Sequence, residues 1–86
     1  MSAELFKKVV SHAKKYGFVY GETYHQVSMG QGQDKVAEQK LDAGNRQGHW
    51  IILNNVHLMP RWLVELEKRL DEYALAGSHE KFRIFL

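Results

Sequence analysis

The chain has 86 residues, of which 44% are hydrophobic, and its 12 basic and 10 acidic side chains leave a formal charge of +2. A chain of this length holds one small domain at most, and such a domain buries roughly 60–65% of its unfolded surface. The absence of cysteine excludes disulfides and thiolate metal sites, and the charge is too evenly balanced for a typical nucleic-acid-binding domain.

The first segment, Ala3–Tyr16, has apolar residues at helical spacing and predicts an amphipathic helix. Ser2 can cap its start, and Gly17 can end it. A helical wheel turns Phe6 and Tyr16 toward the core. On the opposite face, four basic side chains are expected to be solvated: Lys7, Lys8, Lys14 and Lys15. The C-terminal dipole of the helix also favours Lys14 and Lys15.

A strand and a second helix come next. Tyr24–Met29 is rich in β-prone residues and predicts a strand that runs into a glycine turn at Gly30. Whether Phe18–Tyr20 belongs to this strand stays open. Asp34–Gln47 consists mostly of good helix formers, although its apolar stripe is narrow and Gly44 costs about 1 kcal/mol relative to alanine.

Two further strands enclose a third helix. After Gly48, the nearly unbroken apolar run His49–Asn54 has the pattern of a parallel strand covered on both faces. Pro60 suits the first turn of a helix that ends near Gly77, and Phe82–Leu86 has strand character. The apolar face of this third helix is formed by Trp62, Leu63, Leu66, Leu70 and Tyr73.

The element order α-β-α-β-α-β predicts an α/β fold with a three-stranded parallel sheet in a small three-layer αβα arrangement. A helix precedes the first strand, and the last strand ends the sequence. We therefore expect residues 1–86 to form a single partial domain, cut from a larger doubly wound domain.

The turn Gly30-Gln31-Gly32-Gln33 lies between a predicted strand and a predicted helix, where backbone N–H groups could hold a phosphate. A P-loop needs a lysine and a serine or threonine after its glycines, and a dinucleotide-binding turn needs a third glycine where Lys35 stands. The residues favour a structural turn, and anion binding stays the alternative.

The run Trp50–Leu53 followed by Asn54 and Asn55 has the form of a Walker B strand. In an active ATPase this strand ends in an aspartate that holds Mg²⁺ and a glutamate that orients the attacking water. An amide supplies no negative charge and accepts no proton at neutral pH. The strand end is therefore predicted to be inactive in hydrolysis.

Other polar residues form no catalytic pattern. Asp34 with Glu38, and Asp71 with Glu72, are expected to be exposed helix charges rather than catalytic carboxylates. His57 could orient the two asparagines, but such a residue more often caps or packs. No metal site is expected, because the histidines are scattered without i, i+4 pairs: His12, His25, His49, His57 and His79.

Two segments, Ser28–Gln33 (Ser-Met-Gly-Gln-Gly-Gln) and Asn55–Lys68 (Asn-Val-His-Leu-Met-Pro-Arg-Trp-Leu-Val-Glu-Leu-Glu-Lys), give the chain a resemblance to dynein heavy chains. The region that it resembles is the C-terminal part of their sixth AAA+ module, a P-loop-like domain that has lost its nucleotide motifs. The resemblance makes Gly30–Gln33 the turn after the second strand of that module and Phe82–Leu86 its fourth strand. The first strand and its Walker A loop would be missing. Family members usually have Gln-Asn where this chain has Asn54-Asn55.

The resemblance implies a non-catalytic structural segment that transmits strain and closes a motor ring, in contact with neighbouring AAA+ modules of the same heavy chain. It implies no cofactor for the segment itself, whereas the parent would use ATP and Mg²⁺ elsewhere in the ring and move along microtubules with other dynein subunits. Asn55–Trp62 is more similar to axonemal than to cytoplasmic chains. We therefore expect a soluble protein of the cytoplasm and cytoskeleton, in the axoneme of a cilium or flagellum, without nucleic-acid or membrane partners.

Two other classes of protein fit the residues less well. An independent small phosphate- or nucleotide-binding module would use the Gly30–Gln33 turn, but it would need a lysine near Gly32 or an acid at the strand end. A nucleic-acid-binding module would need lysines joined by exposed aromatic side chains, whereas Phe6 and Tyr16 are expected in the core. Self-association through the unpaired edge of Phe82–Leu86 is a further expectation.

Overall fold

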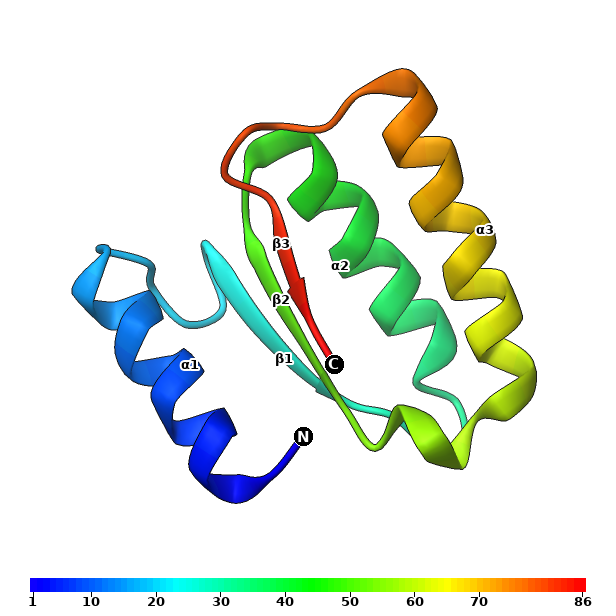
Figure 1. The fold of residues 1–86 in the computed structure, drawn as a ribbon, viewed down its shortest axis with the longest axis horizontal. Coiled ribbons are helices and arrows are strands. Elements are labelled where there is room, and N and C mark those ends of the chain that lie inside the picture. The colour runs from blue at the N-terminus through cyan, green and yellow to red at the C-terminus, as the bar shows by residue number, and fades with distance from the viewer.

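The computed structural model describes residues 1–86 and shows three parallel strands with helices on both faces (Figure 1). The strands are β1 (Tyr24–Ser28), β2 (Trp50–Asn54) and β3 (Arg83–Phe85), and β2 lies in the centre. The predicted α/β class and three-layer arrangement are confirmed. The structure also settles the open question of Phe18–Tyr20, because Tyr20 forms only an isolated bridge to Tyr24.

Helix α1 (Ala3–Lys15) covers one face of the sheet, and α2 (Asp34–Gln47) and α3 (Pro60–Ala76) cover the other (Figure 1). A short 3₁₀ helix, η1 (Val56–Leu58), joins β2 to α3. The helix ends agree with the capping signals in the sequence. Ser2 Oγ accepts a hydrogen bond from the Leu5 amide at 3.2 Å. None of the helices is long and apolar enough to cross a membrane.

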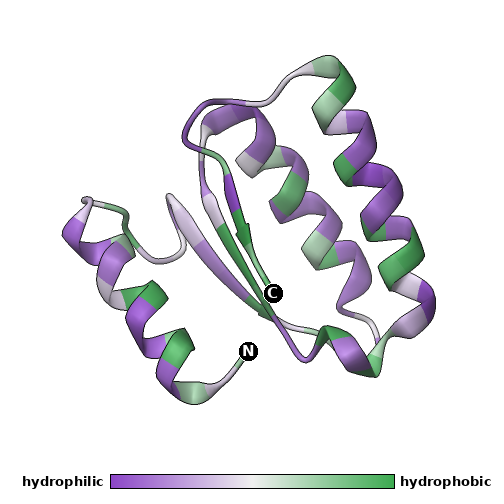
Figure 2. Cartoon of the chain, viewed as in Figure 1, coloured by the Kyte–Doolittle hydropathy of each residue, from purple (hydrophilic) through white to green (hydrophobic).

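The core lies in two parts on either side of β2. Between the sheet and the α2–α3 pair, Leu41, Leu53 and Leu66 are at most 2% exposed. Under α1, a smaller cluster is built around Val9 and Ile52. Green hydrophobic positions gather along β2 and β3 and on the helix faces turned toward the sheet (Figure 2). The strand β2 is thus covered on both faces, as its apolar run predicts.

Two expectations need correction. Tyr16 is 67% exposed, because it caps the end of α1 and only the edge of its ring approaches Trp50. The last strand has three residues rather than the five of Phe82–Leu86, because Phe82 N–H bonds within the preceding loop, to the carbonyl of His79 at 3.0 Å, instead of to β2. Both differences leave the topology unchanged.

Candidate functional site

The carboxyl ends of β1 and β2 lie side by side, so the glycine turn and the two asparagines come together as neighbours. Ser28 and Asn54 are paired in the register of the two strands. The Met29 amide donates to the Asn54 carbonyl at 2.7 Å, which extends the pairing by one residue. This end of a parallel sheet is where open α/β folds bind ligands.

Asn55 has a left-handed backbone conformation, with φ of 62°. This sharp turn starts η1, and the Leu58 amide donates to the Asn55 carbonyl at 3.0 Å. The side-chain Nδ2 of Asn55 donates to Ser28 Oγ at 3.0 Å. Asn55 therefore links the ends of β1 and β2, and an asparagine is one of the few non-glycine residues that tolerates this conformation.

The glycine turn closes through a hydrogen bond from the Gln33 amide to the Gly30 carbonyl at 3.1 Å, and Gly32 has φ of 82°. Gln33 is the N-cap of α2 but makes no side-chain capping bond. Asp34 stands in the first turn of that helix. Because its carboxylate already occupies the positive end of the helix dipole, the turn is a poor place for a second anion.

His57 is exposed and makes no hydrogen bond to either asparagine. Asp71 and Glu72 are also exposed, as predicted. The prediction for Glu38 is wrong: its side chain is only 14% exposed. The reason is that Glu38 faces α3, where it is surrounded by donors that the sequence spacing of α2 alone does not reveal.

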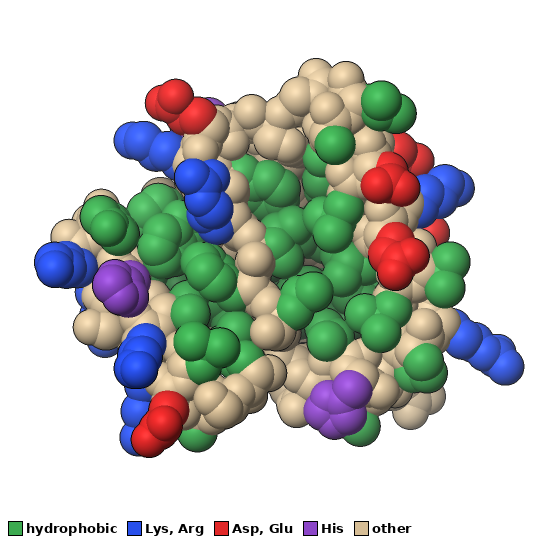
Figure 3. All heavy atoms as spheres, viewed as in Figure 1, with side chains coloured by type: hydrophobic (Ala, Val, Ile, Leu, Met, Phe, Trp, Pro, Cys, Tyr) green, Lys and Arg blue, Asp and Glu red, His purple; other side chains and the backbone are tan.

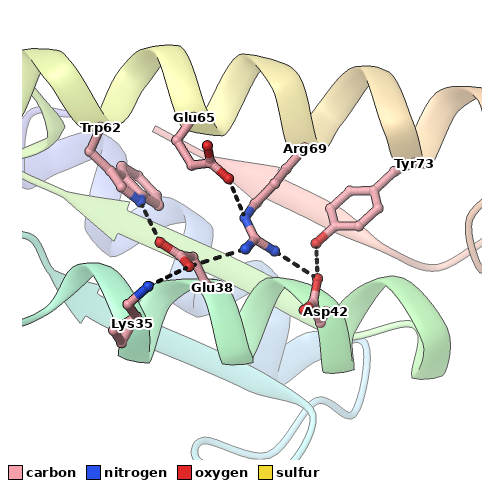
Figure 4. A network of polar contacts seen from close by, with 7 residues as sticks. All are labelled: Lys35, Glu38, Asp42, Trp62, Glu65, Arg69 and Tyr73. Atoms are coloured by element: carbon pink, nitrogen blue, oxygen red, sulfur yellow. Dashed lines mark hydrogen bonds and ion pairs between the residues drawn. The ribbon is translucent and has the colours of Figure 1, made fainter.

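A network of polar contacts joins α2 to α3 (Figure 4). Glu38 accepts from Trp62 Nε1 and from Arg69 Nη2, each at 3.1 Å. The Nη1 of Arg69 donates to Asp42 Oδ1 at 3.2 Å, and its Nε lies 3.4 Å from Glu65 Oε1. One guanidinium thus faces three carboxylates, two from α2 and one from its own helix.

The surroundings in this network favour the charged form of Arg69 and the neutral form of Tyr73. Burial works against the charge of Arg69, but Tyr73, Asp42 and Glu38 together raise its pKa above the ordinary value. The Tyr73 hydroxyl donates to Asp42, and burial together with this bond raises the pKa of Tyr73 to about 12. Of these contacts, only the pair of Arg69 with Glu65 has the i, i+4 spacing that the sequence of a single helix can show.

Sequence reasoning missed a histidine pair. His25 on β1 and His49 just before β2 have their Nε2 and Nδ1 atoms 3.2 Å apart, and the two side chains are 7% and 8% exposed. Burial, with Lys40 and His49 nearby, lowers the pKa of His25 to about 4. The strand register, which pairs Tyr24 with Trp50 and so brings the two histidines together, carries this information, and no local signal in the sequence does.

The parallel α/β sheet, with a glycine turn after β1 and two asparagines after the apolar run of β2, has the arrangement of a P-loop-like domain. The whole chain, residues 1–86, matches the family described as the dynein heavy chain region D6 P-loop domain, and the chain belongs to this family.

Curated relatives agree with this assignment. The ciliary dynein beta chain of Heliocidaris crassispina is 47% identical over 81 residues, which is 93% of this chain, and human dynein axonemal heavy chain 9 is 46% identical over the same share. The flagellar outer-arm dynein alpha chain of Chlamydomonas reinhardtii is 42% identical over 92% of this chain. The chain spans about 2% of the length of each of these relatives.

Proposed function

We propose that this chain is a non-catalytic structural segment of a dynein heavy chain motor ring. The observation that carries the proposal is the end of β2, where Asn54 and Asn55 stand in place of the acids that an ATPase needs. Asn55 is engaged with Ser28 Oγ, so its side chain ties two strands together. It has no charge with which to hold Mg²⁺.

The parent protein would be an ATP-driven microtubule motor of a cilium or flagellum. The relatives, which include ciliary, axonemal and flagellar outer-arm chains, support this proposal. ATP and Mg²⁺ would act at other modules of the ring. The segment would contact neighbouring AAA+ modules of the same heavy chain and reach the other dynein subunits and microtubules only through the parent.

Its mechanical role would follow from the α2–α3 network. Arg69 joins the two helices through Glu38 and Asp42, and Trp62 adds a third link from its indole N–H. Polar links of fixed geometry resist sliding of one helix past the other. A segment of this kind can pass a displacement from one neighbouring module to the next without ligand chemistry of its own.

A thermal melt with and without millimolar MgATP tests the proposal, with magnesium sulfate at matched ionic strength as the control. A ligand at a hundred times its dissociation constant stabilises a fold by about 2.7 kcal/mol, which raises the melting temperature of a small domain by several degrees. We expect no such rise. A rise with MgATP alone would show that the segment binds nucleotide and would overturn the proposal.

The alternative function, a small phosphate- or nucleotide-binding module, makes a different prediction. It would use the backbone amides of the Gly30–Gln33 turn, so phosphate would shift the amide resonances of Gln31 and Gln33 in a saturable way. The carboxylate of Asp34 in the first turn of α2 disfavours this outcome. An Asp34→Asn variant should then bind phosphate more tightly if the alternative is right.

A further inference from the structure

A groove of about 550 Å³ opens at the amino-terminal end of the sheet, opposite to the asparagines. Its walls come from the loop after α1, the turn between α2 and β2, the start of β2 and the loop before β3. Segments that are far apart in the sequence therefore meet here. The proposed structural function makes no use of this end of the molecule.

The groove has an aromatic wall. The ring of Trp50 packs against Phe18 at 4.9 Å between centroids, and its contact with the Tyr16 ring is edge-on, at 6.0 Å between centroids. Tyr16 is exposed, contrary to the expectation from its helical wheel, and Trp50 is only partly covered. Exposed tyrosine and tryptophan side chains, together with arginine, carry much of the binding energy at protein interfaces.

The rim supplies an arginine that is already held in place. Arg83 Nη1 donates to the carbonyls of Glu80 and Phe82, both at 2.8 Å. Its Nη2 and Nε make no hydrogen bond, so the Nε–Nη2 edge of the guanidinium stays open to a carboxylate. Arg83 is also the register partner of Trp50 on the neighbouring strand. A carboxylate bound to this fork would therefore sit next to the aromatic wall.

The loop that carries these groups is fixed before any partner binds. The His79 amide donates to the Asn45 carbonyl at 2.9 Å, and the Lys81 amide donates to His79 Nδ1 at 3.1 Å. The His79 ring lies directly on Gly48, where a Cβ would overlap it. A fixed loop loses little conformational entropy on binding, which favours affinity.

The charge around the groove is positive. Glu80, Lys81 and Arg83 line it and together carry a formal charge of +1, and Lys14 and Lys15 precede the lining residue Tyr16 at the end of α1. The helices α1 and α2 end at the groove, and each C-terminus contributes a partial charge of about −0.5. The formal charges outweigh these dipoles, because Lys14 and Lys15 also stand in the last turn of α1.

We propose that this groove is a docking site for an acidic peptide segment that places an apolar side chain against Trp50 and a carboxylate on Arg83. The proposal goes beyond the structural role given above and does not depend on it. Its basis is the combination of an exposed aromatic wall, an anchored arginine with open donors, and a positive surrounding charge. Figure 3 shows basic side chains beside this apolar surface at the upper left.

The test is a titration of the full chain with a capped peptide, Glu-Glu-Leu-Phe-Glu-Glu, followed through the two tryptophan indole N–H resonances. We expect the Trp50 resonance to shift in a saturable way at millimolar peptide. The Trp62 resonance serves as an internal reference, because its N–H is bonded to Glu38 on the far side of the sheet. A peptide with glutamine in place of every glutamate should bind several-fold more weakly.

Matched variants separate the site from general charge attraction. Lys81→Gln with Arg83→Gln should weaken binding about fivefold, whereas Arg61→Gln with Lys68→Gln, which removes the same two charges from α3, should leave it unchanged. Equal weakening by both pairs, equal binding of the two peptides, or no shift of Trp50 would overturn the proposal. Two other results would also overturn it. The first is a Trp50 shift that depends on protein concentration alone, because a second copy of the chain would then occupy the groove. The second is tighter binding of a short single-stranded oligonucleotide than of the acidic peptide.

Discussion

Arg69 on α3 lies with its Nη2 3.1 Å from Glu38 Oε1 on α2, and the two side chains are 22% and 14% exposed. Removing the guanidinium would leave a mostly covered carboxylate whose remaining cation, the exposed Lys35, lies 3.8 Å away. We therefore expect Arg69→Met to lower the free energy of unfolding by about 2 kcal/mol, below the roughly 3–5 kcal/mol typical of a fully buried pair. Urea denaturation followed by circular dichroism measures this change.

The matched control for this variant is Lys68→Met, which changes an exposed side chain on the same helix and should stay within about 0.5 kcal/mol of wild type. Adding Glu38→Gln to Arg69→Met should recover part of the loss, because an uncharged amide is cheaper to cover than a lone carboxylate. If Arg69→Met unfolds at the same urea concentration as wild type, the network contributes nothing to stability.

A second prediction concerns the core. Leu53 is 0% exposed and Trp62 is 6% exposed, in agreement with their positions in the sequence pattern. Leu53→Ala should cost about 2–5 kcal/mol, a large share of the stability of a small domain. His57→Ala should be mild, because His57 is exposed. Denaturant melts in which both variants lose the same small amount would contradict the assignment of the core.

A third prediction follows from the buried histidine pair. The folded pKa of His25 is lowered from 6.5 to about 4, so between these values the unfolded chain binds more protons than the folded one. The contribution of neutral His25 to the free energy of unfolding is therefore fully present above about pH 6.5, and it is lost as the pH falls toward 4. His49, whose pKa is also lowered by burial and by Lys40, adds a loss of the same sign.

The loss for His25 alone is at most about 3 kcal/mol, from the size of its pKa shift. Thermal melts at about pH 7.5 and about pH 5 measure it. A His25→Leu variant should lose much of this pH dependence, because its side chain cannot be protonated. His57→Gln, at an exposed histidine, should keep it. Equal pH dependence in wild type and His25→Leu would place the cause elsewhere.

The sequence predicted most of the fold because its local signals agree with one another. The periodicity of α1, Pro60 at the start of α3 and Gly48 after α2 each place an element end where the structure has it. From the sequence alone, Gly44 only weakens α2. In the fold it is buried, and a Cβ there would lie 3.1 Å from side-chain atoms of both Ile51 and Phe82. Close contact between helix and sheet explains this glycine, and no local signal carries that information.

The same limit applies to the polar residues. The asparagines at the end of β2 could be found because they follow an apolar run, and a run of this kind is a local pattern. Glu38 and His25 could not, because their partners, Arg69 and His49, lie 31 and 24 residues away in the chain. Burial of a charged or titratable side chain depends on which elements pack together, and that requires the register of the strands and helices.

The last prediction concerns the outer edge of β3, which pairs only with β2. The Arg83 amide donates to the carbonyl of His49, the residue just before β2, so the alternation of the strand turns the Ile84 amide away from the sheet. Figure 3 shows hydrophobic side chains on both sides of this exposed backbone. An unpaired strand flanked by apolar surface is a template for another strand, so we expect the chain to associate as its concentration rises.

Light scattering over a concentration series measures this association, and hydrogen exchange locates it. The Ile84 amide should exchange quickly in dilute solution and slowly when the chain is associated. Leu86→Lys, which places a charge beside the edge where the leucine is 49% exposed, should weaken association. Leu75→Lys provides the matched control, because Leu75 is 90% exposed on α3, and it should leave association unchanged. A chain that stays monomeric at every concentration, with a slowly exchanging Ile84 amide, would show that the edge is already covered within the monomer.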